Sequence, residues 1–164
     1  MALEAIMHVF TKRPALIFLL GVVAILFSVP LYAQTAVKLE AMMLNPAVNW
    51  QEAAVFVLEA SEKGAYNSPE DAFRFALEKQ WLPKNAAPTD TTRLNGIALL
   101  LMRSFDQKGG IFYSIFRNPH YAYREMVQLQ IIRGNTDPFM AVSGQELLLM
   151  IGRILTIKEQ EAQK

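Results

Sequence analysis

The chain has 164 residues, of which 52% are hydrophobic and 19% are charged, and its 16 basic and 15 acidic residues give a net charge of +1. This length suits a single domain, the composition excludes a disordered chain, and the near-neutral charge excludes the positive field that non-specific nucleic-acid binding requires. Because the chain contains no cysteine, thiolate metal sites, thiol nucleophiles and disulfide bonds are excluded as well.

The first 33 residues have the pattern of a secretory signal peptide. Lys12 and Arg13 precede an uncharged apolar run over 15–27, and Pro30 and the small residue Ala33 follow this run. Basic residues before a short apolar core, with a small residue at the cleavage position, are typical of export signals. We therefore expect cleavage after Ala33.

Two alternatives to cleavage remain open from the sequence. Residues 15–33 are nearly long enough to cross a bilayer, so the segment is also compatible with an uncleaved inner-membrane anchor, or with a buried core helix. A signal peptide or an anchor would place residues 34–164 outside the cytoplasm, in the periplasm or cell envelope. Contact with the membrane is then expected only through the N-terminal segment, if it stays uncleaved.

The exported part is expected to begin with a lead-in segment over 34–46 and half of a structural unit over 47–64. Asn49 and Glu52 have the spacing of a capping box, in which each side chain bonds the backbone of the other at a helix N-terminus. This helix is expected to continue until Gly64, which would end it in a left-handed conformation.

A repeat with a period of 50 residues follows. Its two copies, 68–105 and 118–155, share eight identities in the 37 positions from Pro69 to Phe105. The shared residues include prolines, arginines and apolar positions, and Val48–Glu52 also aligns with Val142–Glu146. A fixed period with matched apolar positions indicates a repeated supersecondary unit that packs against its neighbour.

Each copy is predicted to fold as helix, loop, helix. In the first copy Ser68 caps a helix that stops near Trp81 ahead of Pro83, and the second helix spans 94–105. In the second copy Asn118 caps a helix over 121–132, and a capping box of Ser143 and Glu146 precedes a helix over 147–155. The sequence therefore predicts an all-α fold, a small helical bundle of five main helices over 47–158, with a polar tail at 159–164.

The segment 91–103, TTRLNGIALLLMR, resembles the threonine-arginine-alanine-glutamate signature and following helix of S-layer homology repeats. The preceding helix over 73–81 and its loop over 82–90 occupy the places of the first helix and turn of that repeat. The phrases at 109–113, 121–124 and 134–138 are similar to a degenerate form found in periplasmic proteins of spirochaetes. The resemblance implies a pseudo-symmetric helical bundle that binds cell-wall polysaccharide in grooves between repeats.

The residue pattern does not favour catalysis. After cleavage the only histidine is His120, and the chain has no cysteine. A catalytic triad or a zinc site would therefore have one histidine and no thiolate available. Gly109 and Gly110 precede apolar residues rather than lysine, which excludes a phosphate-binding loop. We therefore expect no enzyme activity, no catalytic residue, no metal and no cofactor.

Ligand-binding candidates are aromatic and arginine residues, which stack on sugar rings and bond hydroxyl or carboxylate groups. Core packing is the competing explanation for the two tryptophans, packing between the repeats for the aromatic segment 112–124, and a solvated helix start for Arg93. The candidates are Arg93, Arg117, Tyr121, Arg124, Trp50 and Trp81. Arg93 is expected one residue after a helix cap, with its guanidinium directed at the groove between repeats.

Two pairs of arginines recur at the repeat period. Arg103 and Arg153 are expected late in their helices, where a cation is stabilised by the helix dipole and reaches the last carbonyl groups. Arg74 and Arg124 are expected in first turns, where the dipole disfavours a cation. Their recurrence predicts an acidic or carbonyl partner in the adjacent repeat, with a ligand carboxylate as the alternative.

Together these patterns predict a non-catalytic binding or scaffold module of the envelope, whose leading partner is a cell-wall glycan, either peptidoglycan or an attached polysaccharide. The alternative is an adaptor that docks an envelope protein in a flagellar or transport assembly. An envelope hydrolase is the third class. No nucleic-acid partner is expected.

Overall fold

The computed structural model describes residues 36–66, 68–134 and 136–163, so the predicted signal peptide at 1–33 lies outside the described residues. The chain divides into two units, with the boundary between Ala41 and Met42. Residues 36–44, within the segment expected as a lead-in, are helical. Apart from two isolated bridges, the regular structure of the described residues is helical, and the predicted all-α class is confirmed.

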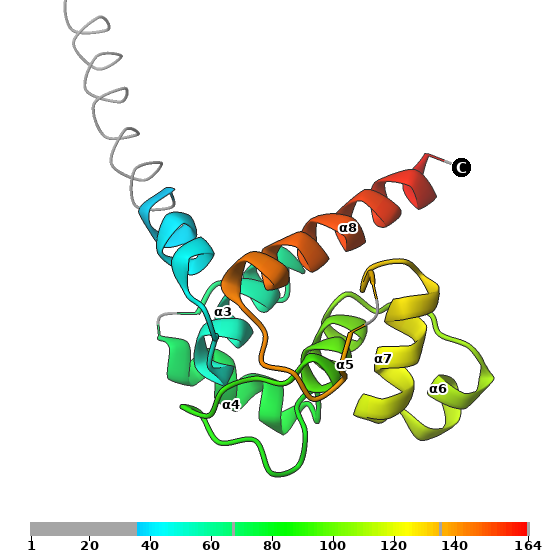
Figure 1. Cartoon of the computed structure of the whole chain (residues 1–164), viewed down its shortest axis with the longest axis horizontal. Coiled ribbons are helices and arrows are strands. Elements are labelled where there is room, and N and C mark those ends of the chain that lie inside the picture. Colours follow the sequence, from blue (N-terminus) through cyan, green and yellow to red (C-terminus); the bar gives the residue numbers. More distant parts are fainter. Residues whose placement is uncertain (1–35, 67, 135, 164) are drawn as a thin grey trace, which may run out of the picture. The chain divides into compact units, whose positions relative to one another are not determined.

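The second unit contains α3 to α8, which Figure 1 labels in chain order. Their bounds are α3 Trp50–Ala60, α4 Pro69–Glu78, α5 Leu94–Ser104, α6 Ile111–Phe116, α7 Pro119–Gln128 and α8 Gly144–Ala162. The five predicted helices correspond to α3, α4, α5, α7 and α8, whereas α6 was not predicted. α8 continues well past 155 and includes residues 159–162, which were expected to belong to a polar tail. None of the described helices is long and apolar enough to cross a membrane.

Four of the predicted N-terminal caps are confirmed, whereas α5 starts at Arg93 without a side-chain cap. Asn49 and Ser143 each accept a hydrogen bond from the backbone of a glutamate three residues later, and that glutamate bonds back, which completes two capping boxes. Ser68 and Asn118 cap α4 and α7, each followed by proline at the first helical position. These side chains satisfy amide groups that have no partner inside the helix.

The helix ends correct three expectations, one of which is that α7 ends at Gln128 rather than at Ile132, because Gln130 has a left-handed φ of 59°. α3 ends through Glu62, which has a left-handed φ of 58°, and not through Gly64. The Lys63 amide donates to the Leu58 carbonyl, so the motif closes before the chain reaches the glycine. α4 ends at Glu78 rather than near Trp81, because Gln80 adopts the same left-handed conformation.

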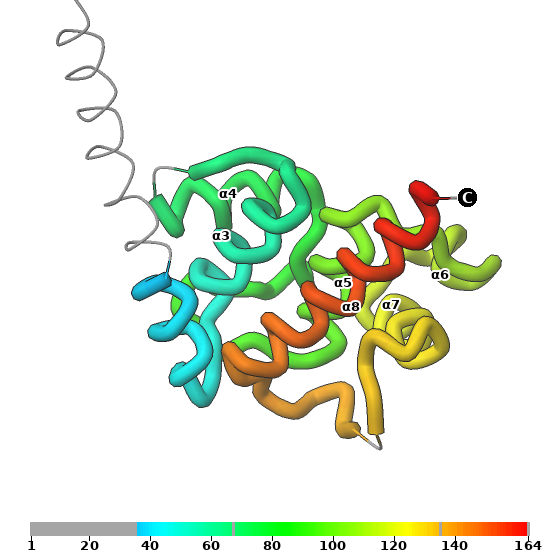
Figure 2. The backbone as a smooth tube through the Cα atoms, turned by 90° about the horizontal axis from the view of Figure 1, so that it is seen from above, coloured from blue at the N-terminus to red at the C-terminus, as the bar shows by residue number. Residues whose placement is uncertain are grey.

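The core lies around α5, which is buried on nearly every side. Its apolar residues from Leu94 to Met102 face neighbours all round, as expected for a helix without a polar stripe. α5 packs chiefly against α7, and α3 packs against α4. α8 packs against α3 and passes over α5 when the molecule is seen from above (Figure 2). The buried apolar residues of the described chain all lie between Met42 and Ile154.

Three extended segments meet in a ring of backbone hydrogen bonds, which we call the three-segment ring. Val48, Thr92 and Val142 each lie one residue before a helix cap. The Val48 amide donates to the Val142 carbonyl, the Thr92 amide to the Val48 carbonyl and the Val142 amide to the Thr92 carbonyl, at 2.9, 2.9 and 3.3 Å. The ring therefore holds the starts of α3, α5 and α8 together.

Glycines allow two close approaches beside this ring. A Cβ atom on Gly144 would lie 1.7 Å from the Met42 carbonyl oxygen, and one on Gly96 would lie 2.6 Å from the indole of Trp50. The Gly144 amide also donates to the Asn45 carbonyl at 2.9 Å. The start of α8 therefore packs closely against residues 42–45, which precede α3.

Candidate functional site

A cavity of about 580 Å³ lies between the end of α5 and the segment that carries α6. We call it the Tyr113 cavity. Trp81 follows α4, Arg103 comes from the last turn of α5, and Tyr113 and Arg117 come from α6 and its end; all four line the cavity. Arg117 is the left-handed C-cap of α6, and its amide donates to the Tyr113 carbonyl at 2.9 Å. The turn thereby fixes the arginine next to the tyrosine.

Arg103 and Arg117 have no carboxylate partner in the described part of the chain. The ion pairs found there join Lys63 to Asp106 and Arg74 to Asp71. Asp106 also lines this cavity, but it is paired with Lys63. Two guanidinium groups that line one cavity without an ion-pair partner form a site suited to an anion, because each guanidinium presents several donors to a carboxylate or phosphate.

The matched arginine Arg153 shows what a purely structural arginine does at this helix position. It donates to the carbonyl of Ile131 at 2.6 Å, in the loop after α7, rather than to the last carbonyls of its own helix as predicted. The corresponding carbonyl for Arg103 belongs to Trp81, and the structure gives Arg103 no hydrogen bond within the described residues. Its guanidinium is therefore free to bond a ligand, although the sequence predicts a structural role.

Tyr113 has an unpartnered hydroxyl group. The side chain is 5% exposed, and its Oη atom is buried without a hydrogen-bond partner. Burial raises the pKa of Tyr113 above its ordinary value of 10.0, while the charges of Arg103 and Arg117 lower it in part and Glu125 raises it. The hydroxyl thus stays protonated at neutral pH and can donate to a bound acceptor.

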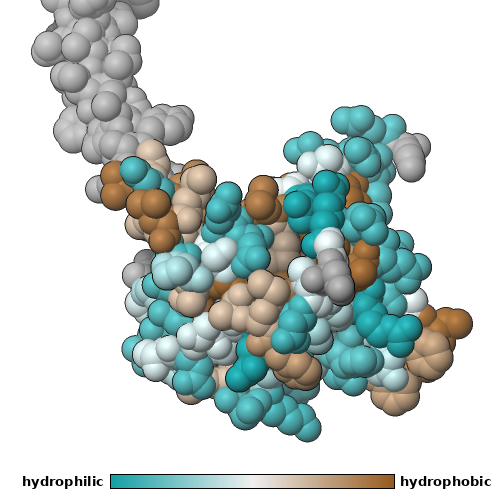
Figure 3. All heavy atoms as spheres, viewed as in Figure 1, coloured by the Kyte–Doolittle hydropathy of each residue, from teal (hydrophilic) through white to brown (hydrophobic). Residues whose placement is uncertain are grey.

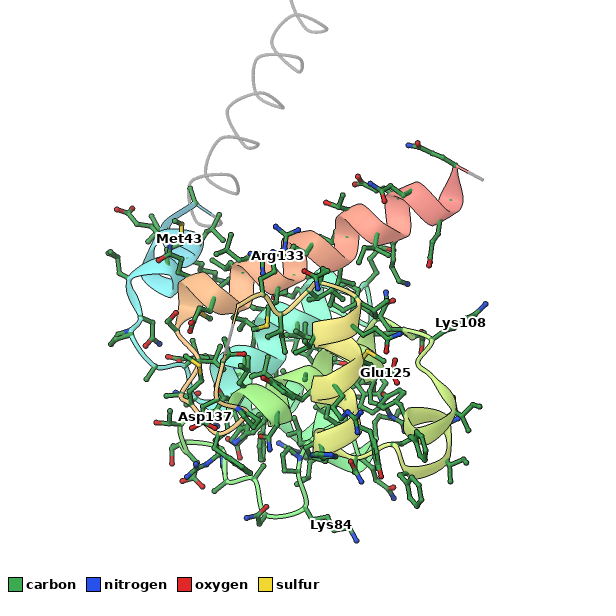
Figure 4. All side chains as sticks on the ribbon, turned by 45° about the vertical axis from the view of Figure 1, so that its right-hand side comes forward. Met43, Lys84, Lys108, Glu125, Arg133 and Asp137 are labelled. Carbon is green, nitrogen blue, oxygen red and sulfur yellow. The ribbon has the colours of Figure 1, made fainter. Side chains whose placement is uncertain are left out.

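Two further cavities adjoin the first, and we call the three together the groove. A cavity of about 970 Å³ shares Arg103 and Arg117 with the Tyr113 cavity. A third, of about 410 Å³, shares Pro83, Asn85 and Pro119 with the second. The groove thus follows the loop between α4 and α5 where that loop faces α6 and α7. Lys84 and Lys108, which line the second and first cavities, project from the surface (Figure 4).

The structure brings four of the six predicted ligand residues to the groove. Trp81 and Arg117 line the Tyr113 cavity, and Trp50 and Arg93 line the third cavity. Trp50 is 4% exposed, so it offers an edge rather than a stacking face. Arg93 is itself the N-cap of α5, not the residue after the cap, and its Nη1 donates to the Phe139 carbonyl at 3.2 Å.

The other two predicted residues lie on α7, outside the three cavities. Tyr121 stacks on Phe112 and Phe116, with ring centroids 5.7 and 5.3 Å apart. Arg124 is exposed on the same helix. The prediction of a partner in the adjacent repeat is wrong for Arg74, because Asp71, one turn earlier in α4, accepts its hydrogen bond at 3.0 Å and both side chains are exposed.

The described residues contain no group of three or more His, Asp or Glu side chains arranged to hold a metal ion. His120 is exposed at the start of α7, edge-on to Tyr121. The groove offers hydrogen-bond donors, positive charge and aromatic surface to a ligand.

Sequence reasoning did not identify Arg103 or Tyr113 as ligand residues. Arg103 occupies the same position of the repeat as Arg153, so the repeat assigns the same role to both. Tyr113 belongs to α6, where the alternation of apolar residues gives no clear period. No protein-family model, no curated protein and no solved structure matches this chain.

Proposed function

We propose that this protein is an exported, non-catalytic module that binds a carboxylate-bearing glycan of the cell wall, peptidoglycan or an attached polysaccharide. The observation that carries the proposal is the Tyr113 cavity, where Arg103 and Arg117 lack carboxylate partners and the Tyr113 hydroxyl is buried without a hydrogen bond. A buried polar group without a partner is costly, and a ligand acceptor would satisfy it.

The groove suits an extended, acidic, hydroxyl-rich chain. The two arginines would bind a carboxylate, the Tyr113 hydroxyl would donate to a neighbouring oxygen, and Trp81 would contact a sugar ring through its exposed part. The second and third cavities continue the binding surface past Lys84 and Asn85. A ligand longer than one sugar would thus contact all three cavities.

We infer that the pairs α4–α5 and α7–α8 are copies of one helix–loop–helix unit, and that α3 is half of another. The starts of both helix pairs are 50 positions apart, at Pro69 and Pro119 and at Leu94 and Gly144. Hydrogen bonds recur at the same spacing, as between the amide of Trp81 and the carbonyl of Ala76, and between those of Ile131 and Met126. This arrangement is in keeping with the resemblance to S-layer homology repeats.

Export of the protein is part of the proposal and rests on the sequence of the first 33 residues. A reporter enzyme that is active only outside the cytoplasm, fused after Lys164, should be active. A fusion protein that is made at full length but shows no reporter activity would overturn the proposed location.

Binding to purified peptidoglycan sacculi tests the proposed function. We expect the parent protein to sediment with sacculi at moderate salt, and Arg103→Gln or Arg117→Gln to weaken this binding about tenfold or more, because a hydrogen bond to a charged group contributes about 1.5–3 kcal/mol. Tyr113→Phe should weaken it by a smaller factor while leaving the fold intact, since its hydroxyl has no partner in the protein.

The matched control is Arg74→Gln, which removes one exposed cation from α4, outside the groove, and should leave binding unchanged. Thermal melts of every variant separate loss of binding from loss of fold. If the parent protein does not sediment with sacculi, and instead one envelope protein co-purifies with it, the glycan proposal fails and the adaptor role takes its place.

A further inference from the structure

The short helix α6 exposes four large apolar side chains at one edge of the second unit. Ile111, Phe112, Ile115 and Phe116 are 56–77% exposed, and we call them the α6 patch. They contribute to the brown hydrophobic surface over α6 in Figure 3. Single exposed apolar residues are ordinary, but a contiguous group of this kind marks an interaction surface.

The patch is held outward by the packing of its own element. α6 has six residues, and Tyr113 is the residue that it buries. Tyr121 of α7 stacks on both Phe112 and Phe116, which supports the two phenylalanine rings from behind. The core is therefore complete without these four side chains, and they are available to another surface.

The surroundings of the patch are cationic. Lys108, Arg117 and Arg124 lie beside the patch in the sequence. The nearby carboxylates are Asp106, which is paired with Lys63, and Glu125, which lies against Gly110. All three cations are exposed. Arg124 lies one turn after Tyr121 on α7, on the side of the helix that carries the aromatic stack.

We propose that the α6 patch binds the surface of an anionic lipid bilayer. Apolar and aromatic side chains enter the boundary between headgroups and acyl chains, while lysine and arginine stay at the level of the negatively charged headgroups. The patch has this composition and layout: a short projecting helix with apolar residues at its surface and cations on both sides.

Charge argues against a second copy of this chain as the occupant. In a symmetric dimer the same patch faces itself, so Lys108, Arg117 and Arg124 would meet their own counterparts, and these three cations outnumber the nearby Glu125. An anionic bilayer instead supplies the opposite charge. This lipid-binding surface lies outside the predicted N-terminal signal or anchor. It shares Lys108, Phe116 and Arg117 with the lining of the groove, and the proposal does not depend on glycan binding there.

The absence of cysteine allows a specific test in the full chain. A single cysteine at Ile115→Cys carries a polarity-sensitive fluorophore on the patch, and Leu149→Cys carries it at an exposed apolar position of α8 as the matched control. Vesicles of phosphatidylcholine, with and without phosphatidylglycerol, are the probe. We expect the emission at position 115 to shift to the blue with phosphatidylglycerol vesicles, and the emission at 149 to stay unchanged.

Two further variants separate the apolar and cationic contributions. Ile111→Ser in the Ile115→Cys chain should abolish the shift, and Lys108→Gln with Arg124→Gln should reduce it. Equal emission at 115 and 149 with phosphatidylglycerol vesicles would overturn the proposal. So would an equal shift with phosphatidylcholine alone, or a shift that grows with protein concentration in the absence of vesicles, which would assign the patch to a second copy.

Discussion

Thr92 is the one polar residue of the three-segment ring, whose other two members are Val48 and Val142. Its side chain is fully buried in the three-segment ring, and its Oγ1 atom has no hydrogen-bond partner. Valine has nearly the same shape without the hydroxyl. Because an unsatisfied buried hydroxyl costs about 1–3 kcal/mol, we expect Thr92→Val to raise the free energy of unfolding by about 1 kcal/mol.

Denaturant unfolding at neutral pH measures this change. The control is the neighbouring exposed residue, where Thr91→Val should change the free energy of unfolding by less than about 0.5 kcal/mol. A loss of stability in Thr92→Val would show that the hydroxyl has a partner, such as an ordered water molecule.

At the scale of single helices, the starts of α8 and α5 differ in a way that mutation can measure. Ser143 and Glu146 form a capping box, whereas the N-cap of α5 is Arg93, whose side chain makes no cap hydrogen bond. We expect Ser143→Ala to lower the free energy of unfolding by about 1 kcal/mol, since it leaves amide groups of α8 without a partner.

Arg93→Ala is the matched substitution and should cost less than about 0.5 kcal/mol. Urea melts of both variants are compared with the parent protein. If both variants lose the same free energy of unfolding, the capping box stabilises the protein no more than an ordinary surface contact.

The helix starts were predictable because caps are local, while several helix ends were not. Ser68, Asn118 and the two capping boxes identify their helices from a few adjacent residues. α3 and α4 end where Glu62 and Gln80 adopt a left-handed conformation. Glycine and asparagine favour this conformation, so a glutamate or glutamine does not indicate it. Packing decides these positions, and packing of Tyr113 likewise decides that α6 forms.

For the molecule as a whole, Gly144 is the point where the start of α8 meets the chain entering α3. Gly144→Ala would place a methyl group against the Met42 carbonyl oxygen, which is backbone and must shift to make room. We expect a loss of about 3 kcal/mol in the free energy of unfolding, at the upper end for an overpacked site.

Gly152 in the same helix is the control. A Cβ atom at Gly152 meets nothing within 4 Å, so Gly152→Ala should stabilise the protein by up to about 1 kcal/mol through helix propensity. Thermal unfolding of the two variants should therefore shift in opposite directions. A tolerated Gly144→Ala would mean that the contact between α8 and Met42 is loose.

The sequence predicts some of the residues that line the groove, but not all of them. The arginines and tryptophans that line the groove could be selected as residue types, and four of the six candidates lie there. The repeat does not distinguish the free arginine, because Arg103 and Arg153 occupy the same repeat position. In the structure Arg103 lies in the last turn of α5, whereas Arg153 lies within the longer α8 and donates to a loop carbonyl. Such a difference arises from tertiary packing and leaves no local signal.

The three-segment ring also determines when the protein can finish folding during its synthesis. Its members are spread over the chain, and the bond that closes the ring joins Val48 to Val142. A growing chain that has left the ribosome only as far as α7 therefore holds two of the three ring residues and lacks α8. Because the last contacts join the most distant segments of the ring, the second unit stays incompletely folded until the residues of α8 have been made.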